Sequence, residues 1–172
     1  FKCRGAYNKM SRLDESARQA GVVAASAGNH AQGVALAAQR LSIKATIVMP
    51  VTTPAIKVDA VRARGARVVL CGDTFDEAAV RAAELVATQG LTFIHPFDDP
   101  DVIAGQGTVA MELVRQAPGP LDYVFICCGG GGLLAGMAAY LRYTWPNTRI
   151  IGVEPEDAAC TQAALNKGRR VT

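Results

Sequence analysis

Several kinds of residue are scarce in this sequence, and each scarcity excludes a class of protein. Only 19% of the 172 residues are charged and only 6% are aromatic. The formal net charge of +3 is spread along the chain. The densest basic stretches contain no aromatic side chain on which a nucleic-acid base could stack: Arg62, Arg64 and Arg67, and Lys167, Arg169 and Arg170. We therefore expect these charges to be solvated and exclude a nucleic-acid partner.

Long apolar runs and metal-like cysteine patterns are also missing. No run reaches the ~18 apolar residues that a membrane-spanning helix needs, and no secretory signal opens the sequence. The five cysteines are odd in number, include no C-x-x-C pair, and form no metal-like cluster with His30 and His95: Cys3, Cys71, Cys127, Cys128 and Cys160. We expect a reduced, cytoplasmic protein without a resident metal or a membrane partner.

Apolar residues and glycines are abundant instead. Half of the residues are hydrophobic and 17 are glycine, a balance typical of compact α/β proteins. Short β-branched runs alternate with helix-periodic stretches, which predicts βαβ units in open, twisted, mainly parallel sheets with helices on both faces. The predicted strands are Val22–Ala25, Ala45–Met49, Arg67–Cys71, Leu91–His95, Tyr123–Cys127 and Arg149–Val153.

The clearest predicted helix runs from Phe75 to Gln89. Thr74 and Glu77 form a capping box at its start, and Gly90 ends it. Its apolar residues recur at helical spacing and predict a buried stripe: Ala78, Ala79, Ala82, Leu85 and Val86. After the next strand, residues 95–101 are rich in turn formers and interrupt the βα rhythm. We take that segment as the boundary between two lobes.

A turn of four glycines, residues 129–132, follows the strand Tyr123–Cys127 and precedes a predicted helix, Leu133–Arg142. Such a turn leaves backbone N–H groups unpaired beside the positive end of the helix dipole. Glycine also lets a ligand approach the backbone closely, and a purely structural turn seldom needs four in a row. The turn therefore predicts an anion site, most simply for a phosphate, with a tight structural turn as the alternative. A P-loop is excluded, because no Lys-Ser or Lys-Thr follows.

The same turn is also compatible with a dinucleotide site. Residues 130–135 match G-x-G-x-x-A, and Glu154 ends the next strand about 20 residues on, where a ribose-binding acid would stand. From spacing alone, an NAD-binding Rossmann-type domain stays an open alternative.

A second strand-to-helix turn spans Ser26 to Gly33. It brings a hydroxyl, an amide and an imidazole together beside backbone donors, which suits a carboxylate and a ring substituent. The alternative is a helix cap made by Ser26 or Asn29, with His30 as a partly buried packing residue. Two such turns at strand ends would face one crevice in an open α/β structure.

Three stretches of the sequence resemble motifs of fold-type II pyridoxal-phosphate enzymes, in the order found in that family. Phe1–Ala6 resembles their S-F-K-x-R-G-A motif, Ser26–Gly33 their asparagine loop, and Gly129–Leu133 their phosphate loop. The likeness extends over essentially the whole chain and implies a two-lobed architecture similar to the tryptophan synthase β subunit. We expect a fragment, because the sequence starts without methionine and the family's partner for the pyridine nitrogen lies beyond it.

Within the family, four stretches look most like the threonine dehydratases, or threonine ammonia-lyases: Ser26–Gly33, Pro96–Asp98, Ile103–Thr108 and Val153–Asp157. This resemblance implies β-elimination of L-threonine to 2-oxobutanoate and ammonia, the first step of isoleucine synthesis, by a cytoplasmic homo-oligomer acting on a small amino acid. Serine dehydratase and serine racemase remain alternatives, as does a noncatalytic α/β module. The implied domains are a small one over residues 21–101 and parts of a large one over residues 1–20 and 102–172.

The resemblance also implies roles for individual residues. Lys2 would bind pyridoxal phosphate as a Schiff base and later transfer protons, with Phe1 against the pyridine ring and Asn29 on its phenolic oxygen. The phosphate would be held by the backbone of Gly129, Gly130, Gly131, Gly132 and Leu133. The substrate carboxylate would be surrounded by Ser26, Ala27, Gly28 and His30.

The resemblance gives Glu154 a structural role, not that of a ribose ligand. In related serine racemases and some dehydratases a divalent metal binds near a segment that resembles Glu154–Cys160 and ends in an acidic residue. Cys160 stands at that last position here, which disfavours the metal site. We also expect these 172 residues alone to be catalytically incompetent or very weakly active.

Overall fold

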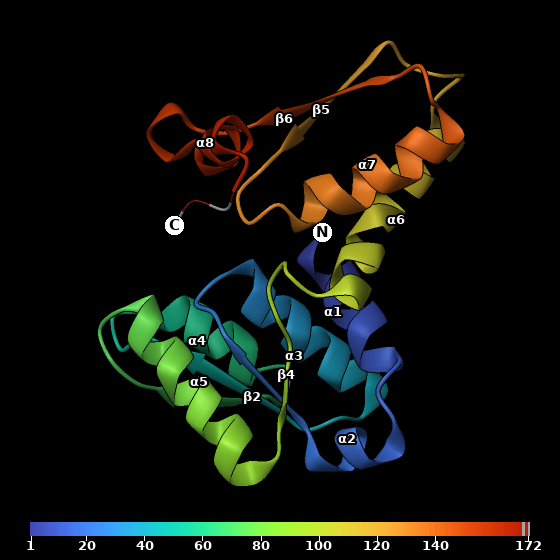
Figure 1. The fold of residues 1–172 in the computed structure, drawn as a ribbon. Helices are drawn as coiled ribbons and strands as arrows, with labels where there is room; N and C mark the ends of the chain where they lie inside the picture. Colours follow the sequence, from blue (N-terminus) through green and yellow to red (C-terminus); the bar gives the residue numbers. More distant parts are fainter. Residues whose placement is uncertain (170, 172) are drawn as a thin grey trace. The chain divides into compact units, whose positions relative to one another are not determined.

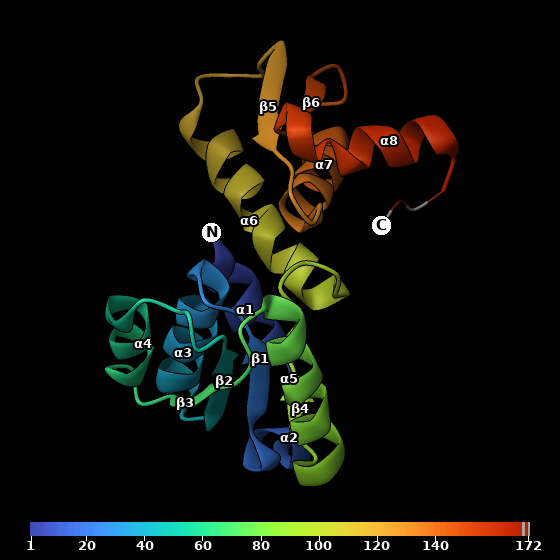
Figure 2. The ribbon, with the colours of Figure 1, turned by 90° about the vertical axis from the view of Figure 1, so that its left-hand side faces the viewer.

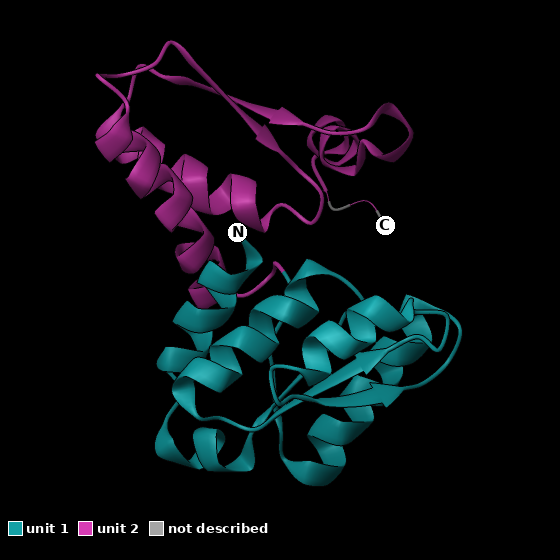
Figure 3. Cartoon of the chain, turned by 180° about the vertical axis from the view of Figure 1, so that it is seen from behind, with its two compact units in different colours: residues 1–96 teal, residues 97–172 magenta. Residues whose placement is uncertain are grey.

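The computed structural model describes residues 1–169 and residue 171, and it divides the chain into two units (Figure 3). Unit 1 spans residues 1–96 and unit 2 spans residues 97–172. Arg170, one of the basic residues expected to be solvated, lies outside the described residues. The assignment of residues 1–20 to a large domain and 21–101 to a small one stays a prediction.

The elements of both units alternate as the sequence predicted (Figure 1). Unit 1 contains α1 (Lys2–Ser11), α2 (Glu15–Ala20), β1 (Val22–Ala25), α3 (Asn29–Leu41), β2 (Ala45–Met49), α4 (Ala55–Arg62), β3 (Arg67–Leu70), α5 (Phe75–Gln89) and β4 (Thr92–Phe93). Unit 2 contains α6 (Pro100–Gln116), β5 (Tyr123–Cys127), α7 (Gly132–Thr144), β6 (Arg149–Val153), the short 3₁₀ helix η1 (Glu156–Ala158) and α8 (Cys160–Lys167). None of the helices among the described residues has the length and hydropathy needed to cross a membrane.

Unit 1 is built on a parallel sheet with the strand order β3-β2-β1-β4. Val22 of β1 pairs with Ala45 of β2 on one side and with Thr92 of β4 on the other. The predicted α/β class with parallel strands is confirmed. The strand predicted over residues 91–95 is shorter than expected, because β4 pairs with β1 alone and Pro96 has no N–H to extend the ladder.

Both faces of this sheet are covered by helices (Figure 2). The core on one face joins α1, α3 and α4 to the sheet, and the core on the other face is made with α5. All of β1 is buried, as a central parallel strand must be when helices pack on both its faces.

Helix α5 has the predicted bounds and the predicted cap. The Thr74 hydroxyl accepts from the Glu77 N–H at 3.3 Å, and the Glu77 carboxylate accepts from the Thr74 N–H at 3.0 Å. Gly90 ends the helix in the left-handed conformation, with φ 66°. The predicted stripe packs against the sheet in the second core: Ala78, Ala79, Ala82, Leu85 and Val86.

Unit 2 holds one parallel strand pair, β5 and β6, that is covered on only one face among the described residues. Val124, Ile126 and Ile150 pack against α6 and α7. The opposite face is apolar and exposed, with exposed fractions of 69% for Phe125 and 47% for Val153. A parallel pair is normally buried on both faces, so this face has the character of an interior surface.

Helices α6 and α7 lie side by side in Figures 1 and 2, and two glycines bring their backbones together. A Cβ atom on Gly136 would lie 2.8 Å from the Gly107 nitrogen and would also meet the carbonyl oxygen of Ile103. The helix pair therefore needs glycine at this crossing.

We predict that Gly136→Ala lowers the free energy of unfolding by about 1–3 kcal/mol, because the added methyl group forces the two helix backbones apart. Intrinsic helix propensity alone predicts a gain of about 1 kcal/mol from the same substitution. Urea unfolding of the purified chain shows whether Gly136→Ala lowers or raises the free energy of unfolding. Ala139→Gly at an exposed position of α7 is the control and should lose about 1 kcal/mol through propensity alone. A stabilised Gly136→Ala variant would contradict the close helix contact.

Candidate active site

The strand order of unit 1 reverses at β1, because β2 and β3 follow on one side and β4 lies on the other. Open α/β sheets bind ligands at such a switch point, beyond the carboxyl ends of the strands. The chain leaves β1 through residues 26–28 and leaves β4 through residues 94–96. The predicted turn Ser26–Gly33 therefore begins at the edge of the sheet where a ligand site is expected.

The turn after β1 presents unpaired backbone donors. The N–H groups of Asn29, His30 and Ala31 open α3 and meet no acceptor among the residues that the structure describes. Gly28 is the N-cap and has no side chain to cap the helix, while the Ser26 hydroxyl accepts from the Gly28 N–H at 3.2 Å. The cap alternative is therefore wrong for Asn29, which is the first helical residue and is exposed. The helix start is left available for an anion.

His30 is turned into the interior. Its side chain is 4% exposed, and its Nε2 lies 2.8 Å from the carbonyl oxygen of Ile94. A carbonyl only accepts, so Nε2 carries the hydrogen and the buried Nδ1 is an acceptor without a partner among the described residues. Burial lowers the pKa of His30 to about 4, and the charges of Lys2 and His95 act in the same direction. The ring is neutral near pH 7, in agreement with a packing residue.

Lys2 stands in the first turn of α1, which packs on α3. The contact is close because a Cβ atom on Gly33 would lie 3.0 Å from the Lys2 carbonyl carbon and from the Cys3 nitrogen. Lys2 Nζ donates to the carbonyl oxygen of Pro96 and lies 5.5 Å from the centre of the Phe1 ring. Burial lowers the pKa of Lys2. The helix contact thus brings this amine to the segment that leaves β4.

The glycine turn of unit 2 presents a second set of unpaired donors. After the Cys128 N–H pairs with Val153, the N–H groups of residues 129–134 meet no acceptor in the described part of the chain. Gly131 is the N-cap of α7, with φ 85°, and no acidic residue lies in the first helical turn. The positive end of the α7 dipole is therefore uncompensated, as a phosphate site requires.

The four glycines of this turn differ in what surrounds them. A Cβ atom on Gly130 would collide with the ring of Phe97, and one on Gly132 would lie 2.6 Å from the Phe97 carbonyl oxygen. A Cβ atom on Gly129 or Gly131 would meet nothing within 4 Å. Packing thus requires two glycines and a positive φ requires a third, but nothing among the described residues requires glycine at position 129. The structural-turn alternative leaves that position unexplained.

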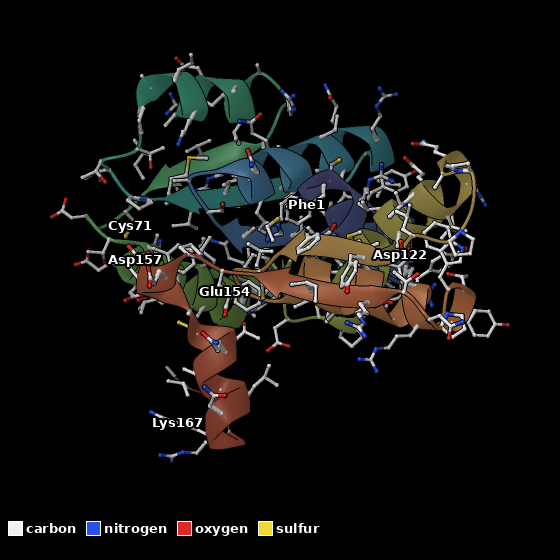
Figure 4. The ribbon with its side chains drawn as sticks, turned by 90° about the horizontal axis from the view of Figure 1, so that it is seen from above. Phe1, Cys71, Asp122, Glu154, Asp157 and Lys167 are labelled. Carbon is white, nitrogen blue, oxygen red and sulfur yellow. The ribbon has the colours of Figure 1, made fainter. Side chains whose placement is uncertain are left out.

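Glu154 caps helix α8. Its carboxylate accepts from the Thr161 N–H at 2.9 Å and from the Gln162 N–H at 3.0 Å, and Figure 4 shows it near the first turn of that helix. The hydrogen bond from Thr161 lowers the pKa of Glu154. Each carboxylate oxygen is therefore engaged with a helix N–H, which favours the structural role and removes the acid that a dinucleotide site would need.

A cavity of about 930 Å³ lies along β6, between α7 and α8. Leu134, Ile151 and Glu154 are among its lining residues, but glycines 129–132 are not. No group of three or more histidine, cysteine, aspartate or glutamate residues that could hold a metal occurs among the described residues. The cavity therefore lies next to the glycine turn of unit 2, with Cys128 and Leu134 in its lining, but the four glycines do not line it.

Three features of the two turns were missed by sequence reasoning. The carbonyl groups of Ile94 and Pro96 receive the hydrogen bonds of His30 and Lys2, and no side-chain pattern reveals backbone acceptors. Phe97 supports the glycine turn, although sequence reasoning named it only as part of the Pro96–Asp98 stretch that resembles threonine dehydratases.

Comparison with known proteins supplies independent information. The whole chain, residues 1–172, matches a family model described as "Pyridoxal-phosphate dependent enzyme". The biosynthetic L-threonine dehydratase IlvA of Haemophilus influenzae is 58% identical over 168 residues, which are 98% of this chain and 33% of that protein. The biosynthetic chloroplastic threonine dehydratase of Arabidopsis thaliana is 57% identical over 171 residues, 99% of this chain and 29% of that protein.

Solved structures give the same picture. The processed form of threonine deaminase isoform 2 from Solanum lycopersicum superposes with a TM-score of 0.96 at 58% identity, covering 99% of this chain and 49% of that one. Maize serine racemase superposes with a TM-score of 0.94 at 35% identity, covering 99% of this chain and 52% of that one. The chain spans about a third of these curated relatives and about half of these solved chains.

The buried His30 ring predicts a loss of stability in mild acid. Its pKa is about 4 in the fold and about 6.5 in the unfolded chain, so the unfolded state binds a proton in this window and the folded state does not. Stability contributed by the neutral ring is lost as the pH falls from 6.5 toward 4, by about 2 kcal/mol between pH 7 and pH 5. Urea unfolding at several pH values measures this slope. His30→Gln should abolish it and His95→Gln should keep it; an unchanged slope in His30→Gln would contradict the assignment.

The glycine turn predicts a large effect at one position and almost none at the adjacent one. Gly130→Ala should lower the free energy of unfolding by about 1–3 kcal/mol, because the methyl group overlaps the Phe97 ring. Gly129→Ala meets open space and no left-handed φ, so its unfolding free energy should change by less than about 0.5 kcal/mol. Chemical denaturation of the two variants tests the pair, and equal destabilisation at both positions would refute this account of the turn.

Proposed function

This chain belongs to the family of pyridoxal-phosphate-dependent enzymes, and from that membership we propose that it is part of a threonine dehydratase, which converts L-threonine to 2-oxobutanoate and ammonia. The observation that carries this proposal is similarity along the whole chain, at 57–58% identity to proteins named threonine dehydratase and at 35% to a serine racemase. Dehydration of serine and racemisation of serine are the alternatives within the family.

The residues of both turns suit the cofactor. The unpaired N–H groups of Gly129–Leu133 would bind its phosphate. The phosphate would lie on the open side of the turn, where a Cβ atom on Gly129 would meet nothing within 4 Å. Lys2 would hold the cofactor covalently through Nζ. The lowered pKa of Lys2 favours the unprotonated amine that this attachment and later proton transfer require.

The bound cofactor supplies a ring that withdraws electrons from the substrate and so acidifies its α-proton. The Lys2 amine, once free, would take that proton. The exposed Asn29 amide would hydrogen-bond to the phenolic oxygen of the cofactor ring, and the Phe1 side chain would pack against the face of the ring. Phe1 is 50% exposed and lies beside the Lys2 amine, which agrees with that role.

The substrate carboxylate would lie at the start of α3. The unpaired N–H groups of Ala27, Asn29 and His30 are suitable donors there, and the Ser26 hydroxyl can add its hydrogen. The His30 ring is neutral and its remaining nitrogen is an acceptor, so His30 would contribute its backbone N–H to the carboxylate and not its side chain. The N–H of Gly28 already donates to Ser26, so Gly28 contributes by leaving space.

We further propose that the 172 residues act only as part of a longer, homo-oligomeric enzyme. The uncovered apolar face of β5 and β6 has the character of an interior surface, and the relatives carry about twice to three times the chain length. The five cysteines are free, which agrees with a reducing compartment such as the cytoplasm. Some relatives are named chloroplastic or mitochondrial, so an organelle is the alternative location.

We predict that borohydride reduction of the complete enzyme with pyridoxal phosphate attaches the cofactor to the peptide containing Lys2. Lys2→Arg should abolish this attachment and lower the rate of threonine deamination by at least about 10²–10⁴-fold, because the attachment point and the base are lost together. Peptide mapping by mass spectrometry and a 2-oxobutanoate assay measure the two effects.

Lys57→Arg, at an exposed position on α4, is the matched control and should keep both properties. Attachment at a different lysine, or a Lys2→Arg enzyme with full activity, would refute the proposed role. The same assay with serine tests the substrate, because one methyl group in a pocket shifts specificity by only about 1–3 kcal/mol.

A further inference from the structure

We propose that Phe97 is a positioning residue for the phosphate, because it supports the glycine turn, residues 129–132, from the side opposite the ligand. The proposal rests on the proposed function, since it assumes that this turn binds the phosphate of the cofactor. Phe97 itself would not touch the phosphate. It would act by holding the backbone N–H groups of the turn in one orientation.

The first argument is the contact between Phe97 and alternate residues of the turn. The Phe97 ring fills the place where a side chain at Gly130 would lie, and its backbone oxygen and Cα lie 2.6 Å and 3.0 Å from the Cβ position of Gly132. The Cβ positions of Gly129 and Gly131 are open. The turn therefore has a supported side and an open side, and the proposal places the phosphate on the open side.

The second argument is that Phe97 is itself held in place through the fold of unit 2. Two residues later, the Asp99 carboxylate accepts from the N–H groups of Asp101 and Val102 and so fixes the start of α6. Helix α6 is packed against α7 at the crossing of Gly107 and Gly136. Helix α7 begins in the glycine turn, so Phe97 and the turn are joined by a closed path of rigid elements.

The third argument is the flexibility of glycine. A run of four glycines has more accessible backbone conformations than any other sequence of that length, and a phosphate would have to order them on binding. An aromatic ring packed under the turn reduces that freedom before the ligand arrives. Such preorganisation raises affinity without any new contact to the ligand.

The test compares two ligands that differ only in the phosphate: pyridoxal phosphate and pyridoxal. Their dissociation constants are measured on the complete enzyme by absorbance. In addition, ³¹P NMR of the bound cofactor reports the environment of its phosphate. We expect Phe97→Ala to lower the preference for the phosphorylated ligand by about tenfold or more, with a smaller loss in Phe97→Leu, as lost preorganisation predicts. The affinity for pyridoxal should stay within about twofold in both variants, and the ³¹P resonance should shift or broaden.

A double variant separates positioning from general damage to the fold. Gly130→Ala alone should also lower the phosphate preference, because its methyl group overlaps the ring. In Phe97→Ala combined with Gly130→Ala, the methyl group occupies part of the space that the ring has left, so the double variant should bind phosphate better than either single one. Tyr143→Ala, an 89% exposed aromatic residue of α7, is the control and should leave the preference unchanged.

An unchanged preference for pyridoxal phosphate over pyridoxal in a folded Phe97→Leu or Phe97→Ala enzyme would overturn the proposal. The proposal would also fail if the loss of this preference in the double variant equalled the sum of the losses in the two single variants. Thermal unfolding of each variant reports whether the enzyme is folded, and Phe97→Leu provides the milder change if the alanine variant does not fold. If the unaltered enzyme itself binds pyridoxal as tightly as pyridoxal phosphate, the phosphate role of the turn fails. The proposed role of Phe97 then fails as well. This outcome is seen in the unaltered enzyme, so it can be distinguished from a failure that appears only in the Phe97 variants.

Discussion

The structure depends on how the first N–H groups of each helix are satisfied, because no helix can pair them internally. In α5, α6 and α8 these groups are bound by the side chains of Thr74, Asp99 and Glu154. In α3 and α7 the N-cap is a glycine, and the groups stay unpaired among the described residues. The capped helices thus serve the fold, whereas α3 and α7 leave two positive helix ends open, where we propose that the anionic groups of a cofactor and a substrate bind.

Close backbone contacts join these helix starts to the rest of each unit. Gly33 lets α1 approach α3 and so brings the Lys2 amine to the carbonyl of Pro96. In unit 2, Gly136 lets α6 approach α7, and the chain before α6 supplies the ring beneath the glycine turn. In both units a glycine that binds nothing decides where a reactive or binding group lies, because only a missing side chain permits the contact.

Much of this was visible in the amino-acid sequence, because it is encoded locally. The capping box of Thr74 and Glu77 and the glycine turn each lie within a few neighbouring residues, and the strands follow from the alternation of strand-like and helix-like patterns along the chain. The family likewise followed from short motifs, and the comparisons agree with it. The strand at residues 91–95 was predicted too long, since strand length depends on how many neighbours a strand has in the sheet.

The sequence by itself determined the fold class, the two strand-to-helix turns and the family. Tertiary structure alone decided that the His30 ring is neutral and turned inward, that Glu154 caps a helix, and that Phe97 lies under the turn. These properties arise from contacts between residues as far as 64 positions apart, as between His30 and Ile94. Burial and hydrogen-bond partners are created by folding, and no local pattern of residue types carries them.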